Sequence, residues 1–165
     1  MRHMAKIELT VTLYPSEILY DIENKTHLLA RTSAEGDSIL AAADTIVDGS
    51  EEADNQVMRS LNAALATLWS RLGEYVQNDD VTTHDVLTRA SQPYVITLLV
   101  PTNFNKANTQ HIGALAHQFM VNQTIGEWYA LTSKESAEYF TTLASANLDS
   151  ILEYINKRER PVRKS

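Results

Sequence analysis

The sequence predicts a mainly helical α+β fold. The expected architecture is a bundle of three long helices with one or two short ones, joined to a two- to three-stranded antiparallel sheet or arm. Apolar residues recur at steps of three and four over long stretches, which is the helical period, while only short segments alternate as strands do. A chain of 165 residues that is 44% hydrophobic is expected to form one domain, residues 1–165, with its own core.

The first predicted element is a strand over residues 6–14. Ile7, Leu9, Val11 and Leu13 alternate there with Glu8, Thr10 and Thr12, as expected for a strand with one buried face. Pro15 ends the strand, and Ser16 is a candidate cap for a helix that continues to about Arg31. The polar residues 24–26 interrupt the apolar pattern of this helix.

Residues 38–47, between Gly36 and Gly49, fit either a short helix or a mobile acidic loop. The next helix has a stronger signal, because Ser50 is a capping residue and acidic residues follow it. Its apolar positions keep the helical period as far as Val76, and residues 78–80 are expected to close the helix in a turn.

Residues 81–89 have weak strand character, and residues 94–100 form a better strand that ends at Pro101. The second run is apolar on both faces, so the prediction is burial on both sides or an interface on one side. Two or three strands are too few for a sheet-based domain. The strands are therefore expected to form a small flap or arm on a helical body.

The last third, residues 102–160, predicts two long helices joined by a short polar turn. Thr132 begins an S/T-x-x-E capping box for the second helix, and Pro161 fixes its end. Gly113 and Gly126 lie inside the first helix, where glycine favours close packing against another backbone over flexibility. The apolar stripes of the two helices predict a packed helical hairpin.

Charge is distributed unevenly along the chain, whose net charge is −7. Residues 35–54 hold seven acidic residues and no lysine or arginine, whereas residues 157–165 form a basic tail. The acidic total argues against a dedicated nucleic-acid binder. The tail could contact a phosphate backbone or an acidic patch on another subunit, and the alternative is a solvated helix end. The absence of cysteine, of a secretory signal and of a membrane-length apolar run predicts a chain with no disulfide and no membrane contact.

The sequence contains no motif for bond chemistry. It lacks a G-x-S-x-G elbow, a P-loop and a G-x-G-x-x-G turn. His111 and His117 are six residues apart, on different faces of a helix, and His84 beside Asp85 fits a surface pair. We therefore predict no catalytic residue, no metal ligand and no cofactor; the remaining enzyme hypothesis requires His117 and Glu127 to face one cavity.

Three stretches resemble small uncharacterised proteins that phages and prophages of gut bacteria encode. They are residues 20–26 (YDIENKT), the helix around residues 61–75, and residues 155–161 (INKRERP). The resemblance spans most of the chain. It implies a structural protein of a virion that is assembled in the host cytoplasm, of the neck or head–tail connector kind, whose partners are copies of itself and other virion proteins.

These observations predict a non-enzymatic, self-associating protein, because a two-faced apolar strand and a basic end both offer contacts to neighbouring subunits. The alternative is an intracellular adaptor or regulatory domain that binds one partner through Trp128 and Tyr129, which could act as interface anchors. The candidate interface residues are Tyr94, Ile96, Leu98, Val100, Trp128, Tyr129, Arg158, Arg160 and Arg163.

Overall fold

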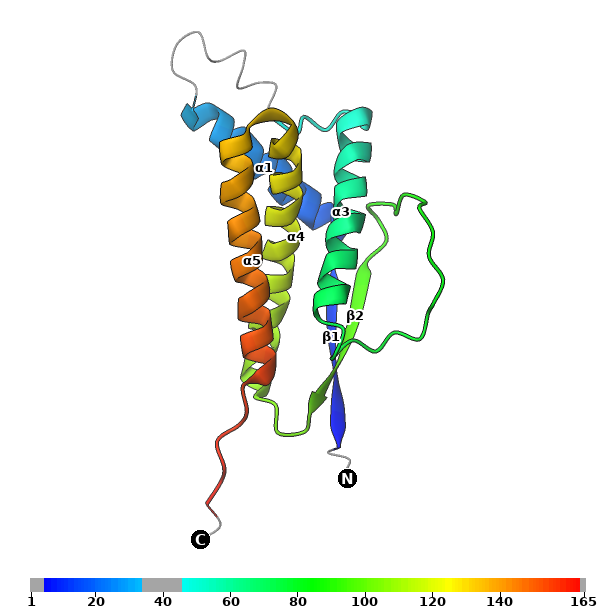
Figure 1. Ribbon diagram of the computed structural model, residues 1–165, viewed down its shortest axis with the longest axis vertical. Helices are drawn as coiled ribbons and strands as arrows, with labels where there is room; N and C mark the ends of the chain where they lie inside the picture. Colours follow the sequence, from blue (N-terminus) through cyan, green and yellow to red (C-terminus); the bar gives the residue numbers. More distant parts are fainter. Residues whose placement is uncertain (1–4, 34–45, 164–165) are drawn as a thin grey trace.

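The computed structural model describes residues 5–33 and 46–163 (Figure 1). In chain order the elements are β1 (Lys6–Leu13), α1 (Pro15–Ser33), α3 (Glu51–Arg71), β2 (Tyr94–Pro101), the 3-10 helix η2 (Lys106–Asn108), α4 (Thr109–Thr132) and α5 (Lys134–Asn156). The predicted fold class, mainly helical with a small antiparallel sheet, is confirmed. The short helix or loop expected around residues 38–47 falls almost entirely outside the described residues.

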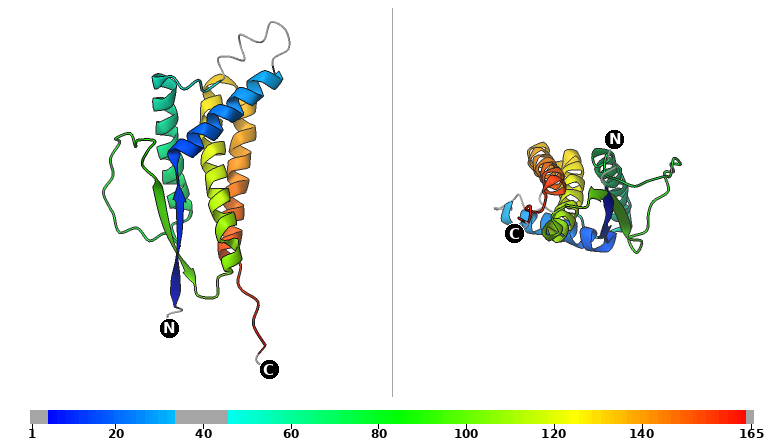
Figure 2. Two further views of the ribbon diagram at one scale, coloured as in Figure 1. Left: turned by 180° about the vertical axis from the view of Figure 1, so that it is seen from behind. Right: turned by 90° about the horizontal axis from the view of Figure 1, so that it is seen from below.

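The helices α3, α4 and α5 stand side by side, and α1 runs from the end of β1 obliquely across α4 and α5 (Figures 1 and 2). The hairpin of α4 and α5 has a link of one residue, Ser133, whose N–H donates to the carbonyl of Tyr129 at 2.6 Å. Thr132 is the last residue of α4, so the predicted capping box is wrong. Ser133 occupies the cap position and its hydroxyl contacts that of Ser136 instead. The link is too short for a separate capping turn.

Close packing explains one of the two helix glycines. A Cβ built on Gly126 would lie 2.8 Å from the Cγ2 atom of Thr141, so α4 approaches α5 at a distance that no larger residue permits. A Cβ on Gly113 would meet nothing within 4 Å. The expectation of close packing therefore fits Gly126 and fails for Gly113.

Helix α3 begins where the sequence predicts and ends earlier. The hydroxyl of Ser50 accepts a hydrogen bond from the N–H of Ala53, which satisfies one free donor of the first turn. The helix stops at Arg71 and not near Val76. Val76 still contacts the core, but it does so from an extended segment that bridges to β2, so its apolar character does not depend on a helix.

The sheet is an antiparallel pair in uninterrupted register, from Lys6 opposite Pro101 to Leu13 opposite Tyr94. One face is buried against the helices, as the alternation in β1 predicts. Residues 81–89 are not a strand, contrary to the prediction. Val81 is 99% exposed and Val86 is 68% exposed there, so the β-branched residues have no partner strand or core to pack against.

The polar residues 24–26 do not interrupt α1, because Thr26 has a structural role. Its side chain is fully buried, and its hydroxyl donates to the carbonyl of Glu23 at 3.1 Å. The same oxygen accepts a hydrogen bond from the N–H of Val47 at 3.2 Å. This threonine therefore joins α1 to the segment that leads into α3.

Candidate functional site

The four candidate interface residues of β2 lie in the core of their own chain. Tyr94, Ile96, Leu98 and Val100 are between 0% and 5% exposed. The backbone of β2 is also flanked by β1 over its length and, around Leu98, by the segment after α3. The expectation that these side chains form an exposed interface is therefore corrected. The local run is apolar on both faces, but only the outer face, with Val95 at 52%, reaches solvent.

Tyr129 is likewise corrected as a surface anchor. It is 3% exposed, and its ring centroid lies 5.7 Å from that of Phe140, so it holds the upper end of the hairpin together. Trp128 is half-buried and packs against the core beside the first turn of α3. Neither residue projects as the free aromatic contact that the adaptor hypothesis requires.

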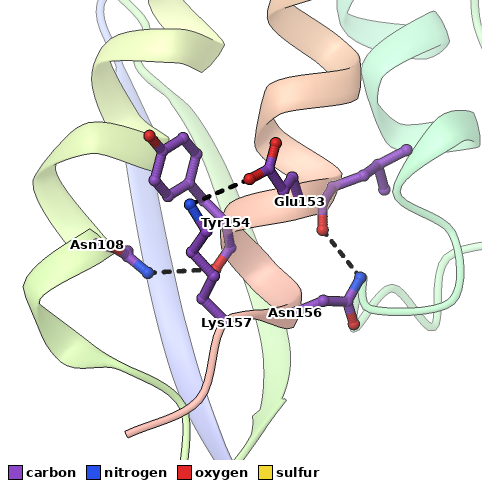
Figure 3. A network of polar contacts seen from close by, with 6 residues as sticks. Asn108, Glu153, Tyr154, Asn156 and Lys157 are labelled. Atoms are coloured by element: carbon purple, nitrogen blue, oxygen red, sulfur yellow. Dashed lines mark hydrogen bonds and ion pairs between the residues drawn. The ribbon is translucent and has the colours of Figure 1, made fainter.

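The basic tail begins as a fixed segment. Its first residue, Lys157, lies over the Tyr154 ring with the ammonium 3.9 Å from the centroid, and forms an ion pair of 3.1 Å with Glu153 (Figure 3). The Asn108 side chain donates to the carbonyl of Tyr154 in the same network, which closes the base of α5 against α4 (Figure 3).

Beyond this network the tail pairs with the loop before η2. The N–H of Asn105 donates to the carbonyl of Lys157, and the N–H of Glu159 donates to that of Asn103. Arg158 is exposed and donates one guanidinium N–H to the carbonyl of Ile155 at 3.0 Å, which holds its side chain against the end of α5. Arg160 and Arg163 are exposed on the segment that leaves the bundle, and no hydrogen bond or ion pair ties their side chains to the described residues, so they are the freest of the predicted arginines.

The opposite end of the molecule is acidic. Asp48, Glu51, Glu52 and Asp54, which we call the acidic end, surround the first turn of α3. Hydrogen bonds from Ser50 hold the pKa of Asp48 below its usual value, so this carboxylate stays charged. Burial, and after it the charge of Asp54, raise the pKa of nearby Glu23. Carboxylates are thus crowded at this end.

An apolar groove of about 490 Å³ lies between α1 and α5. Leu28 and Tyr139, 49% and 61% exposed, are among its lining residues. It is also lined by a chain of amides, in which Asn122 donates to Asn147 at 2.9 Å and Asn147 donates to Gln118 at 3.3 Å. Nothing local in the sequence marks these amides, because they come from two helices and meet only in the hairpin.

The histidine predicted as a possible acid or base has a different partner from the one expected. The Nε2 atom of His117 lies 2.7 Å from the Oδ2 atom of Asp21, across the contact between α4 and α1. Asp21 is 96 residues away in sequence, so no spacing could indicate it. A histidine–aspartate pair can orient an imidazole for proton transfer, but both side chains are partly exposed, and here they join two helices.

A second cavity, of about 520 Å³, lies between α3 and the long loop that precedes β2. Arg59, Trp69 and His84 are among its lining residues, and Tyr94 closes one side by donating its phenol hydrogen to the Oδ1 atom of Asn62 at 3.1 Å. Burial raises the pKa of Tyr94 to about 12.

This raised pKa predicts a loss of stability in alkali. Below about pH 10 the Tyr94 phenol is neutral in the folded and the unfolded chain, so its full contribution to the free energy of unfolding is present. Above that pH the phenol ionises first in the unfolded chain, and stability falls as the pH approaches 12. We expect Tyr94→Phe to show a smaller fall in the free energy of unfolding between about pH 8 and about pH 11. Urea titrations of the wild type and of Tyr94→Phe at each pH measure this fall, and an equal fall in the two proteins would contradict the prediction.

None of the helices within residues 5–33 and 46–163 combines the length and apolar character that a bilayer crossing requires. In the same part of the chain, the histidine, aspartate and glutamate side chains form no group of three that could hold a metal ion. Comparison of the chain with protein-family models, with curated proteins and with solved structures found no match.

Proposed function

We propose that this chain is a non-enzymatic structural protein of a phage particle, which assembles with copies of itself and with other virion proteins at the neck or head–tail connector. The resemblance of residues 20–26, 61–75 and 155–161 supports the kind of particle. One structural observation supports assembly: the acidic end and the basic tail lie at opposite ends of an elongated molecule (Figure 1).

Opposite charges at opposite ends favour a head-to-tail contact. Arg160 and Arg163 project beyond the bundle, where they can meet the carboxylates of Glu51 and Glu52 in the next copy. Such a contact joins two different surfaces, so it repeats from copy to copy, and it closes into a ring when the rotation per copy divides a full turn. A ring is the form that a neck or connector component needs.

The charge contact predicts salt-dependent assembly. At micromolar protein we expect light scattering to detect oligomers at low ionic strength, and a marked fall in their size at about 0.5 M salt, where charges on the surface are screened within a few ångströms. The double variant Arg160→Glu and Arg163→Glu should form no salt-sensitive oligomers at low salt. The matched control, Arg71→Glu with Arg89→Glu, changes the net charge equally at exposed sites outside the tail and should assemble normally.

Rescue makes the test specific. Adding Glu51→Arg and Glu52→Arg to the tail variant restores opposite charges at the two ends and should restore the oligomers. A wild-type chain that stays monomeric at every salt concentration, alone and with the other proteins of its particle, would overturn the proposal.

The second candidate function is a protein adaptor, and the groove between α1 and α5 is the observation that favours it. Exposed Leu28 and Tyr139 beside a chain of hydrogen-bonded amides resemble a surface that anchors apolar side chains while fixing their orientation. The two functions differ in stoichiometry. A chain that never self-associates, and whose partner is displaced by Tyr139→Ala, would be an adaptor.

A further inference from the structure

Within the described residues, the outer edge of β1 is open over its whole length, whereas the outer edge of β2 is covered around Leu98. On the far side of β2, the N–H of Leu99 donates to the carbonyl of Tyr75, and the N–H of Gln77 donates to that of Thr97. Successive residues of a strand direct their backbone N–H and carbonyl groups to alternate sides. The backbone groups of Leu98, and of residues 94, 96 and 100, therefore point toward β1.

The register then identifies the groups on the open edge. The partners of these β2 residues are Ile7, Leu9, Val11 and Leu13, so the N–H and carbonyl groups of the alternate residues point away from β2. The outward-facing residues are Lys6, Glu8, Thr10 and Thr12. In the described part of the chain, no hydrogen bond engages the backbone of these four residues.

The open edge is regular, and the side chains of its four outward-facing residues are exposed. Figure 2 shows that the N-terminal half of β1 extends below α3 with β2 beside it, while the other end of β1 lies next to α1 and α4. Bulges and prolines protect natural edge strands from further pairing, and β1 has neither. Only the charges of Lys6 and Glu8, near one end, restrict which strand can approach.

We propose that this edge pairs antiparallel with β1 of a second copy, so that two molecules share a four-stranded sheet. A two-fold axis beside Leu9 sets Glu8 opposite Thr10 of the second copy, and Lys6 opposite Thr12. This register uses all four outward-facing residues and puts no like charges directly opposite each other. An axis beside Glu8 would oppose two glutamates, and an axis beside Ile7 or Thr10 would leave part of the strand unpaired.

A second copy fits this edge better than a foreign strand does. Two-fold pairing matches edges of equal length and covers the open edge of both molecules at once, so no third copy can add to the sheet there. A foreign strand would bring a further edge of its own. The contact is isologous and almost free of charge pairs, so it is independent of the head-to-tail contact in the proposed function.

Cross-linking tests the register directly, because the chain contains no cysteine. Residues in a hydrogen-bonded antiparallel pair have Cα atoms about 5.5 Å apart, within the range that a disulfide spans. Glu8→Cys combined with Thr10→Cys should therefore give a covalent dimer on mild oxidation at about 0.5 M salt, where the charge contact is screened. The control, Val95→Cys, places an exposed thiol on the outer face of β2 and should give little dimer.

A second variant tests the hydrogen bonds. Thr10→Pro removes an outward N–H that has no partner within the chain, so it should weaken dimerisation in sedimentation equilibrium by about tenfold or more. Thr10→Val keeps the N–H and the β-branched side chain and should dimerise as the wild type does.

The outcomes separate the two proposals. Cross-linking of the Glu8/Thr10 cysteine pair that does not exceed that of Val95→Cys would overturn β1 pairing, even if salt-dependent oligomers form. A cross-linked dimer that also forms when Arg160 and Arg163 are both glutamate supports β1 pairing, whatever becomes of the head-to-tail contact.

Discussion

Replacing Leu98 by alanine is expected to lower the free energy of unfolding by about 2–5 kcal/mol, the usual cost of a cavity left by a buried leucine. Leu98 is 1% exposed, in the middle of β2. Its backbone lies between Leu9 of β1 and Val76 of the segment after α3, so the site cannot collapse without breaking sheet pairing. Urea unfolding followed by circular dichroism measures the change.

Val95 provides the matched control for this prediction. It lies in the same strand, but on the outer face and 52% exposed, so Val95→Ala should change the free energy of unfolding by no more than about 0.5 kcal/mol. The comparison decides the role of β2. If Leu98→Ala were as mild as Val95→Ala and instead abolished self-association, β2 would act as an arm for a neighbour and not as part of the core.

Local signals predicted the elements that depend on local chemistry. The alternation of apolar residues in β1 indicated both a strand and its buried face. Ser50 indicated the start of α3 because the cap is a contact across three residues. The hairpin of α4 and α5 followed from two apolar stripes that had to be buried against each other.

The errors have a common physical cause, which is that the deciding partner is distant in sequence. Val76 fits a helical pattern, but its backbone forms a bridge with Leu98 of β2. Valines in residues 81–89 have strand propensity, yet no strand is available to pair with them. Thr26 looks like a break in the apolar pattern because its hydrogen-bond partner, Val47, is 21 residues away.

The candidate surfaces were harder to predict than the fold for the same reason. An apolar strand residue has the same sequence signature whether a neighbour or its own core covers it, and this ambiguity misplaced Ile96 and Val100. Arg158 and Arg163 have equal charge, but only the first donates to a backbone carbonyl in α5. The open edge of β1 depends on which of its two sides β2 occupies, and alternation of side chains does not encode that choice.

Gly126→Ala is expected to lower the free energy of unfolding by about 1–3 kcal/mol, although alanine is the better helix former, because overpacking an existing contact costs more than the propensity gains. The new Cβ would lie 2.8 Å from the Cγ2 atom of Thr141 and 3.3 Å from its backbone nitrogen. The Thr141 hydroxyl donates to the carbonyl of Ala137 at 2.9 Å, which opposes rotation of its side chain away from the clash. Helices α4 and α5 would have to separate.

Gly113→Ala in the same helix isolates this effect. Its Cβ would meet nothing within 4 Å, so only the helix propensity acts, and the substitution should raise the free energy of unfolding by about 0.5–1 kcal/mol. Urea titrations of the two single variants should therefore shift the unfolding midpoint in opposite directions from the wild type. A stabilising effect at both positions would mean that α4 and α5 do not approach closely at Gly126, and that the single-residue link at Ser133 permits a looser hairpin than the one described.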